Sequence, residues 1–285
     1  LTGGTGSFGR AFLRHALAHD VQRVVVFSRD ELKQSALRDE LADPRLRFFL
    51  GDVRDQDRLM QAFDGVDVVI SAAPHKRLDA RAYNPWEMKR TNVVGTEHVI
   101  RAAFERKVGR VLVVSSDKMC EAWNFYGMTK ALAEGLAIAG NTYATRSGTR
   151  ISVVRYGNVM GSRGSVIPLW RRAVAEGRPL TVTDTRCTRF WITMPWAVDL
   201  ILTALRIMRG GEVIVPVLPA MRVLELACAI APDGHPIIEG SLRPGGEKLH
   251  ETLLTAGEVA RTLANVEEAV YVVPPDVPAN LLWRA

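Results

Sequence analysis

Long hydrophobic runs are missing from this sequence of 285 residues. No apolar stretch reaches the roughly 18 residues that a membrane-spanning helix needs. The longest runs, such as Val66–Ala73, have the length of a strand. No charged segment followed by an apolar core and a cleavage site is visible. A strand normally precedes a glycine-rich turn of the kind found at the start of this sequence, so we expect further residues before Leu1. The sequence predicts a protein that is not embedded in a membrane.

Cysteine is scarce. Cys120, Cys187 and Cys228 are odd in number and widely spaced, and they form neither a zinc-ligand pattern nor a disulfide framework. We therefore expect no metal site, and a protein suited to the reducing cytoplasm.

Blocks of basic residues are also absent, although the net charge is +6 and the pI is about 9.5. No aromatic residues interleave the scattered arginines, as single-stranded nucleic acid would require, so nucleic-acid binding is not expected. The charge indicates either an ordinary solvated surface or a cleft in which a few arginines bind phosphate groups.

Hydrophobic residues make up 47% of the chain, enough to bury a large core. In the first half, continuous Val/Ile/Leu/Phe runs alternate with amphipathic segments such as Phe8–His19, which is typical of parallel strands covered on both faces. This alternation predicts an α/β fold, a Rossmann-like doubly wound parallel sheet, over residues 1–157. The expected strands are Arg23–Phe27, Leu46–Leu50, Val66–Ala72, Arg110–Ser115 and Ile151–Tyr156.

After Gly157 the segments become shorter and prolines interrupt them repeatedly. We expect that residues 158–285 form mainly a smaller substrate-binding lobe, from which the chain can cross back to the sheet. Helices are expected near Val166–Glu176, Trp196–Met208 and Met221–Ala231, and a loosely held end from about Pro274.

A glycine-rich turn opens the first helix. Gly3, Gly6 and Gly9 allow, in a dinucleotide-binding fold, a tight turn, the approach of backbone to a pyrophosphate and close packing of helix on strand. The helix directs its first amides at the phosphates. The predicted cofactor contacts of this segment are Gly3, Thr5, Gly6, Ser7, Phe8 and Gly9.

The second strand ends in Ser28-Arg29, where an NAD-preferring site usually has an acidic residue on the ribose 2′-hydroxyl. A guanidinium, with Lys33 one helical turn further on, suits a 2′-phosphate instead, so NADP is favoured over NAD. Asp30 is the competing feature, because it could turn toward the ribose. Asp52 and Val53, after the third strand, are expected near the adenine.

The residues Tyr126 and Lys130 form a Tyr-x-x-x-Lys pair, which lies on one face of a helix. We expect the ammonium of Lys130 to lower the pKa of Tyr126, making it a base near neutral pH, and to hold the nicotinamide ribose. Asp117 and Lys118 follow a predicted strand at the sheet edge where ligands of open α/β sheets bind, which predicts an acid–base pair.

Together these stretches resemble the extended short-chain dehydrogenase/reductases and, within them, the soluble inverting UDP-N-acetylglucosamine 4,6-dehydratases. The matching stretches run in order over nearly the whole chain: Thr2–Gly9, Ser28–Gln34, Gly51–Asp55, Tyr83–Pro85, Thr91-Asn92, Asp117-Lys118, Tyr126–Lys130, Arg155–Val159, Ser162–Val166, Thr188–Thr193 and Glu247–Glu251.

The resemblance implies a lyase with a dehydrogenase fold and a UDP-sugar substrate. Tyr126 would take the proton of the sugar 4-hydroxyl, Lys118 would remove the C5 proton and Asp117 would protonate the departing 6-hydroxyl. Further cofactor contacts are implied at Ala72, Ala73, Lys76, Thr91 and Val159, and sugar-nucleotide contacts at Lys76, Asn158, Arg163, Arg189 and Arg243. The family also implies a homo-oligomer, a dimer or a hexamer.

Three stretches depart from the family pattern and bear on the substrate and on the stereochemistry at C5. They are the loop Met119–Phe125, with Glu121 and Trp123, the segment Ala72–Arg77, and one extra glycine in Arg243–Glu247. Three other functions stay open: a 4-epimerase of the same fold, which needs Tyr126 but not the Asp117–Lys118 pair, a simple 4,6-dehydratase that retains C5, and a non-catalytic NADP-binding regulator.

Overall fold

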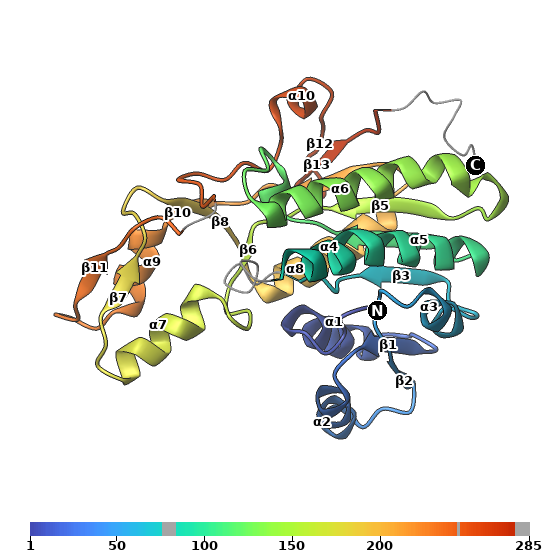
Figure 1. Cartoon of the computed structure of the whole chain (residues 1–285), viewed down its shortest axis with the longest axis horizontal. Helices are drawn as coiled ribbons and strands as arrows, with labels where there is room; N and C mark the ends of the chain where they lie inside the picture. Colours follow the sequence, from blue (N-terminus) through green and yellow to red (C-terminus); the bar gives the residue numbers. More distant parts are fainter. Residues whose placement is uncertain (76–83, 244–245, 277–285) are drawn as a thin grey trace.

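The computed structural model describes residues 1–75, 84–243 and 246–276 of the chain. A larger body carries the central sheet, and a smaller lobe extends from it at the left of Figure 1. The body is the predicted doubly wound α/β fold, so the fold class is confirmed.

The central sheet has the strand order β12–β13–β9–β5–β4–β3. Strands β3, β4, β5 and β9 are parallel, whereas β13 and β12 are added in antiparallel fashion at one edge. Thr2 bridges in parallel to both Ser71 and Phe27, so the first residues connect β3 to the parallel pair β1–β2. The strands are β1 (Val24–Ser28), β2 (Leu46–Leu50), β3 (Val68–Ser71), β4 (Arg110–Val114), β5 (Arg150–Val154), β9 (Val213–Pro216), β12 (Leu263–Asn265) and β13 (Val270–Val273), and they include all five predicted strands.

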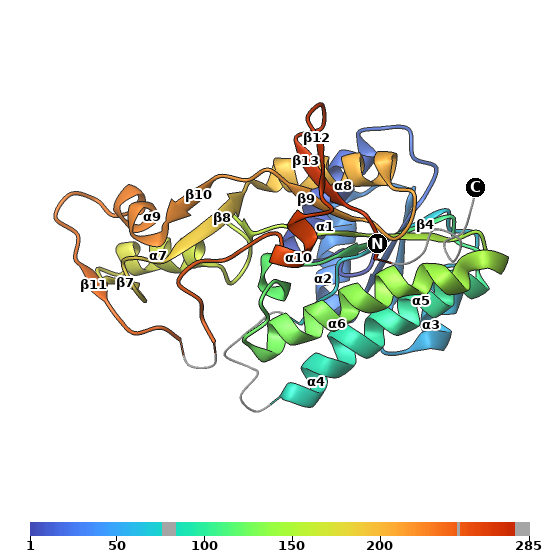
Figure 2. The same cartoon turned by 90° about the horizontal axis from the view of Figure 1, so that it is seen from above.

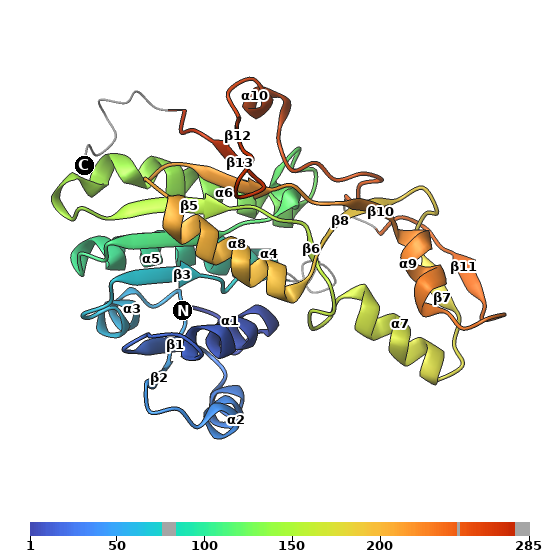
Figure 3. The same cartoon turned by 180° about the vertical axis from the view of Figure 1, so that it is seen from behind.

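Helices cover both faces of this sheet, as Figures 2 and 3 show. Helices α3, α5 and α6 lie together on one face, and α1 and α8 contact each other on the opposite face. A short π-helix, Arg90–Val94, joins α4 to α5. The helices of the body are α1 (Ser7–Leu17), α2 (Glu31–Leu41), α3 (Gln56–Ala62), α4 (Pro85–Lys89), α5 (Gly95–Glu105), α6 (Phe125–Gly140), α8 (Met194–Ile207) and α10 (Ala256–Val259).

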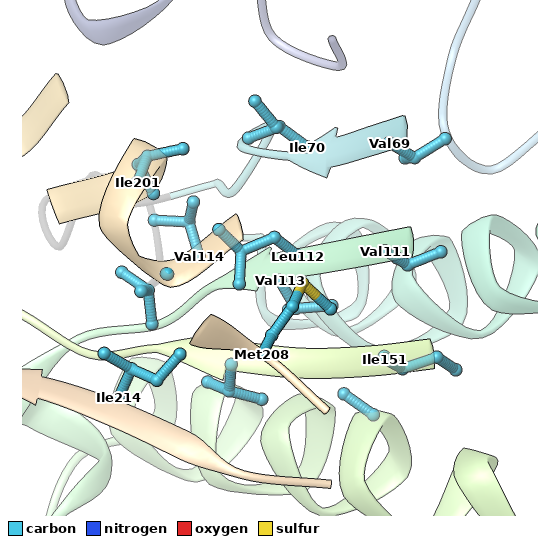
Figure 4. Close-up of a cluster of buried hydrophobic side chains, with 14 of the residues drawn as sticks. Val69, Ile70, Val111, Leu112, Val113, Val114, Ile151, Ile201, Met208 and Ile214 are labelled. Atoms are coloured by element: carbon cyan, nitrogen blue, oxygen red, sulfur yellow. The ribbon is translucent and has the colours of Figure 1, made fainter. Parts of the chain in front are cut away.

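The core lies between the sheet and these helices. Consecutive residues of β4 are buried on alternating faces, which explains why the strand is a continuous apolar run. Figure 4 shows this cluster, in which Ile201 of α8, Met208 and Ile214 lie around the side chains of β3, β4 and β5.

The lobe is built on short strands and two helices. Strand β8 (Thr188–Ile192) pairs with β6 (Asn158–Val159) and β10 (Ala220–Arg222), and β7 (Leu180–Val182) pairs with β11 (Ile237–Glu239). Helices α7 (Val166–Ala175) and α9 (Val223–Ile230) bury a separate core with Trp170 and Trp191.

The chain crosses between the two parts more than once. After β8 it returns to the body as α8 and β9, leaves again for β10, α9 and β11, and returns as α10, β12 and β13. The described residues after 157 are therefore shared between lobe and sheet. No helix in the described parts of the chain is long and apolar enough to cross a membrane.

A fully buried guanidinium joins three distant segments of the body. Arg155, directly after β5, forms ion pairs with Glu134 of α6 and with Glu258 of α10, the latter at 2.8 Å. It also donates to the carbonyl of Leu253 at 2.7 Å and lies 3.3 Å from the sulfur of Cys120. Burial raises the pKa of Glu258, but the hydrogen bonds and charge of Arg155 and two hydrogen bonds from Thr255 outweigh it and hold this pKa at about 2.

We predict that Arg155→Met lowers the free energy of unfolding by about 3–5 kcal/mol, because it leaves two carboxylates without their buried counter-charge. Urea unfolding followed by circular dichroism measures the change. The matched control is Arg178→Met, which removes an exposed ion pair with Glu176 and should change stability little. Equal effects of the two substitutions would contradict the structural role of Arg155.

Candidate active site

The glycine-rich turn is held close to its neighbours. Gly3 has φ +68°, and a Cβ there would lie 2.3 Å from the carbonyl oxygen of Ala72, just after β3. A Cβ on Gly9 would lie 2.3 Å from the carbonyl oxygen of Gly4, so only glycine lets α1 pack on the turn. Helix α1 begins without a side-chain cap, which leaves its first amides available to an anion. The turn therefore fits the diphosphate of a dinucleotide.

A pocket continues from this turn along the carboxyl ends of β3 and β4. It contains four of the residues predicted to bind the cofactor, together with apolar and small polar side chains. Its lining is Val53, Ser71, Ala73, Pro74, Thr91, Asn92, Gly95, Thr96, Val113, Val114 and Lys130. The residues present thus fit a dinucleotide cofactor.

The ends of β1 and β2 carry the residues expected to distinguish NADP from NAD. The carboxylate of Asp30 caps α2 at the amide of Lys33 and pairs with the ammonium of Lys33, so it is engaged with its own helix. Arg29 lies 3.4 Å from Asp52, and its side chain remains 57% exposed. The hydroxyl of Ser28 accepts a hydrogen bond from Gln34 at 3.0 Å. Both predicted cations are paired with a carboxylate and about half exposed, Arg29 directly at the end of β1 and Lys33 on α2 with its side chain 50% exposed.

Asp117 and Lys118 form a close pair in the turn after β4. The Lys118 ammonium donates to Asp117 Oδ1 at 2.9 Å and to Asn158 Oδ1 at 3.1 Å. Asp117 is fully buried; its Oδ1 also accepts from the hydroxyl of Ser116, whereas its Oδ2 has no partner among the residues that the structure describes. A buried carboxyl group with one unpaired oxygen, bonded to an amine, is suited to exchange protons with a ligand.

Helix α6 brings Tyr126 to this turn. The side chain of Asn124 caps the helix by accepting from the amide of Gly127 at 2.8 Å. A Cβ on Gly127 would lie 2.2 Å from the carbonyl oxygen of Lys118, so glycine at this position is what lets the helix start against the turn. Tyr126 is then near enough to Asp117 for the negative charge of that carboxylate to act on its phenol.

The expected effect of Lys130 on Tyr126 is wrong for the protein without ligands. Burial, and then the charge of Asp117, raise the pKa of Tyr126 well above its usual range. The amine of Lys130 is buried and donates to the carbonyl of Val114 at 2.6 Å, and burial lowers its pKa to about 8. The Lys130 nitrogen is directed at this carbonyl, and its charge is not among the influences that act on the Tyr126 phenol.

The residues predicted for the sugar nucleotide separate into three places, and Lys76 lies outside the described residues. Asn158 contacts Lys118. Arg163 instead contacts the glycine-rich turn, since its amide donates to Ser7 Oγ and its guanidinium to the carbonyl of Thr5. The cofactor contacts expected at Ala72 and Val159 lie beside Gly3 and on β6.

The remaining two arginines share a partner. Arg189 is buried and donates to Glu247 at 3.1 Å and to the carbonyl of Leu249 at 3.0 Å. Arg243 is 61% exposed and lies 3.4 Å from the same carboxylate. Arg189 is therefore engaged within the protein, and Arg243 keeps the more accessible charge.

Two of the departures from the family pattern lie against each other. Asn124, in the loop Met119–Phe125, donates to the carbonyl of Gly246 at 3.1 Å, and Gly246 has φ +99°. Glu121 has a left-handed backbone with φ +45°, and Trp123 is 71% exposed. The altered loop and Gly246 are thus in direct contact, close after the turn that carries Asp117 and Lys118.

Sequence reasoning missed three polar residues of this site. Ser116 bonds Asp117, Glu251 Oε1 lies 3.7 Å from the ammonium of Lys118, and Lys248 pairs with Glu251 at 3.0 Å. The segment Glu247–Glu251 stood out in the sequence only as a motif. Lys118 and Glu251 are 133 positions apart, so the sequence does not indicate that their side chains lie close together.

Comparison with known proteins gives this geometry a family. The model of the family described as "Polysaccharide biosynthesis protein" matches residues 1–274. The chain belongs to this family. A UDP-N-acetylglucosamine 4,6-dehydratase (inverting) of Campylobacter jejuni is 41% identical over 280 residues, 97% of this chain and 82% of the relative. A UDP-glucose 4-epimerase of Rickettsia akari is 39% identical over 287 residues, with 97% and 82% covered.

Solved structures of similar proteins have the same fold as this member of the polysaccharide biosynthesis family. The X-ray structure of Pen from Bacillus thuringiensis superimposes with a TM-score of 0.93 at 35% identity, covering 98% of this chain and 86% of that one. The dTDP-glucose 4,6-dehydratase DesIV of Streptomyces venezuelae, solved with NAD bound, has a TM-score of 0.79 at 25% identity, with 98% and 92% covered.

We predict that Lys130 loses its proton near pH 8, as its lowered pKa requires. In protein labelled with [13Cε]lysine, one resonance should titrate there and vanish in Lys130→Met. The folded protein then binds fewer protons than the unfolded chain between about pH 8 and 10.5, so Lys130 makes the free energy of unfolding rise with pH in this window. A Lys130 resonance that stays that of an ammonium at pH 9 would contradict the burial argument.

Proposed function

We propose that this protein is an NADP-dependent nucleotide-sugar 4,6-dehydratase that acts on UDP-N-acetylglucosamine or a close relative. The observation that carries this proposal is the Asp117–Lys118 pair, an acid bonded to a base, next to Tyr126 at the edge of the sheet. Removal of a poor leaving group needs both an acid and a base, whereas reversible oxidation of a hydroxyl needs only the tyrosine and the cofactor.

The residues act on the sugar in sequence. Tyr126 takes the proton of the 4-hydroxyl as C4 becomes a ketone, which acidifies the C5 proton. A nicotinamide cofactor held by the glycine-rich turn would supply uptake of the C4 hydride and its return to C6, and its oxidised, positively charged ring would favour ionisation of a nearby phenol. Lys118 takes the C5 proton while Asp117 gives a proton to the departing 6-hydroxyl, so that one water leaves. Reprotonation of C5 from the opposite face would invert that centre.

The bond between the two residues supports this division of roles. At 2.9 Å the Lys118 nitrogen and Asp117 Oδ1 share a hydrogen bond, which places the proposed base and the proposed acid side by side. Because Asp117 has an unpaired Oδ2 in a buried setting, the neutral acid is well suited to face a departing hydroxyl. The name of the Campylobacter relative supports the same reaction.

A second candidate is a nucleotide-sugar 4-epimerase, and the 39% identity to a Rickettsia epimerase is the observation that favours it. An epimerase also needs Tyr126 and the cofactor, but it leaves C5 and C6 unchanged. It therefore gives no role to the Asp117–Lys118 pair, which is why we place it second. A non-catalytic regulator would need neither the pair nor the tyrosine.

NADP is the proposed cofactor because the accessible cation at the end of β1 is Arg29, and Asp30 is occupied as the cap of α2. A guanidinium can form paired hydrogen bonds to a 2′-phosphate.

We further propose that the protein self-associates through α6. This helix exposes Phe125, Met128 and Leu132 on one side, an apolar surface that a second copy could cover. A cytoplasmic location is also proposed, since Cys120, Cys187 and Cys228 are free thiols in the described structure and burial raises the pKa of Cys120 to about 12.

We predict that the protein incubated with UDP-N-acetylglucosamine in deuterated water forms a product lighter by one water with deuterium at C5. Lys118→Met and Asp117→Asn should each lower this rate by about 100-fold or more, the usual contribution of a general acid or base. Product mass and proton NMR measure both effects. Lys89→Met, on the exposed side of α4, is the control and should keep the rate. Unchanged mass with a mixture of 4-epimers, and full activity of Lys118→Met, would support the epimerase instead.

We predict that Arg29→Ala weakens NADP binding by about tenfold or more, because a charged hydrogen bond to the 2′-phosphate is lost. Binding of NAD, which lacks that phosphate, should change little and serves as the internal control. Calorimetric titration of both cofactors measures the two values. An equal loss for both would rule out Arg29 as the source of cofactor preference.

A further inference from the structure

Glu251 is a nearly buried carboxylate that lies between two ammonium groups. Its Oε1 lies 3.7 Å from the nitrogen of Lys118, and its Oε2 lies 3.0 Å from the nitrogen of Lys248. The side chains of Glu251 and Lys248 are 4% and 6% exposed, whereas Lys118 is 21% exposed. Lys118 therefore reaches the site, and the other two residues lie behind it.

Lys248 also fixes the position of this carboxylate relative to the catalytic turn. Its ammonium donates to the carbonyl of Cys120 at 2.7 Å, two residues after Lys118. The segment Glu247–Glu251 is in turn held by Arg189, which donates to Glu247 and to the carbonyl of Leu249. Ion pairs thus connect Asp117 to Lys118, Lys118 to Glu251 and Glu251 to Lys248, so that negative and positive side chains alternate. A hydrogen bond from Lys248 to the carbonyl of Cys120 ends this series.

The two hidden residues act on Lys118 in opposite directions. A carboxylate at 3.7 Å favours the ammonium form of Lys118, which cannot take a proton. The positive charge of Lys248 offsets part of the negative charge of Glu251. This electrostatic effect is strong because the two buried groups are poorly hydrated. Removal of Glu251 should thus favour the amine form of Lys118, and removal of Lys248 should favour the ammonium form.

The other ionisable groups near Lys118 are unchanged whether Glu251 or Lys248 is replaced. Asp117 is its direct partner, and Tyr126 and Tyr156 lie near Asp117 from α6 and from the end of β5. Beyond Cys120, Arg155 is balanced by its two carboxylates, Glu134 and Glu258. The Glu251–Lys248 pair is the neighbour whose two charges can be removed separately.

We propose that Glu251 and Lys248 are positioning residues that set how much of Lys118 is present as a free amine. Neither acts on the sugar itself; both act through Lys118. The consequence for turnover rests on the proposed function, in which the Lys118 amine removes the C5 proton. The rate then increases as Lys118 loses its proton, and the acid side of the pH profile of kcat/KM follows the state of Lys118.

The experiment follows Lys118 directly by NMR of protein labelled with [13Cε]lysine, in the absence of substrate. The chain has only seven lysines, and Lys118→Met assigns the resonance. In Glu251→Gln the midpoint of the Lys118 titration should move to lower pH, because a close opposite charge is lost. In Lys248→Met it should move to higher pH. The double variant Glu251→Gln/Lys248→Met, a neutral pair, should return toward the wild type.

Opposite shifts separate this role from a merely structural one, which would move both variants in the same direction or leave both unchanged. Either of those outcomes in folded variants overturns the proposal. Lys248→Arg keeps the charge and should restore the wild-type midpoint, which distinguishes lost charge from lost packing.

The pH profile of dehydration gives the second reading. If the Lys118 midpoints shift in opposite directions but the wild type forms no dehydrated sugar, the proposed function fails and the charge relation stands. If the wild type dehydrates its substrate and the midpoints do not diverge, the present inference fails and the proposed function stands.

Discussion

The buried guanidinium of Arg155 joins the parts of the chain on which the candidate site depends. It connects the end of β5 to Glu134 of α6 and to Glu258 of α10, and it lies 3.3 Å from the sulfur of Cys120 in the catalytic turn. Helix α6 carries Tyr126, and the segment before α10 carries Glu251. The removal of one member from such a buried cluster leaves charges uncompensated, so the cluster fixes these segments relative to one another.

Close backbone contacts then set the geometry at the atomic scale. Gly127 lets α6 begin against the carbonyl of Lys118, and Gly3 lets the phosphate-binding turn approach the end of β3. At both positions a Cβ would lie within 2.3 Å of a carbonyl oxygen. The acid–base pair, the phenol and the cofactor pocket therefore meet at one edge of the sheet because glycine occurs at the points of contact. This is the edge at which open α/β sheets bind their ligands.

Local patterns were sufficient to predict strands β1 to β5 and the glycine-rich turn, and to single out Asp117, Lys118, Tyr126 and Lys130 as candidates. Each of these rests on a few neighbouring residues or on the period of one element. The state of Tyr126 was not predictable in this way, because it depends on how deeply the phenol is buried and on Lys130 being bonded to the carbonyl of Val114.

Contacts between distant segments were equally out of reach. Arg155 could be recognised as part of a motif, but not as the partner of Glu134 and Glu258. Arg163 was expected at the sugar nucleotide, yet it contacts the glycine-rich turn, and Arg189 is engaged by Glu247. The return of β9, β12 and β13 to the sheet likewise depends on tertiary packing, because a short strand-like run does not show which strand it pairs with.

The central claim is that one active site oxidises C4, removes water across C5 and C6, and then reduces C6. It is tested most directly by incubating the protein with UDP-N-acetylglucosamine that carries deuterium at C4 and locating the label in the product by NMR. The account predicts that the deuterium is retained and is found at C6, because the same hydride leaves one carbon and returns to the other. Deuterium that stays on C4, in a product of unchanged mass, would contradict the dehydratase assignment.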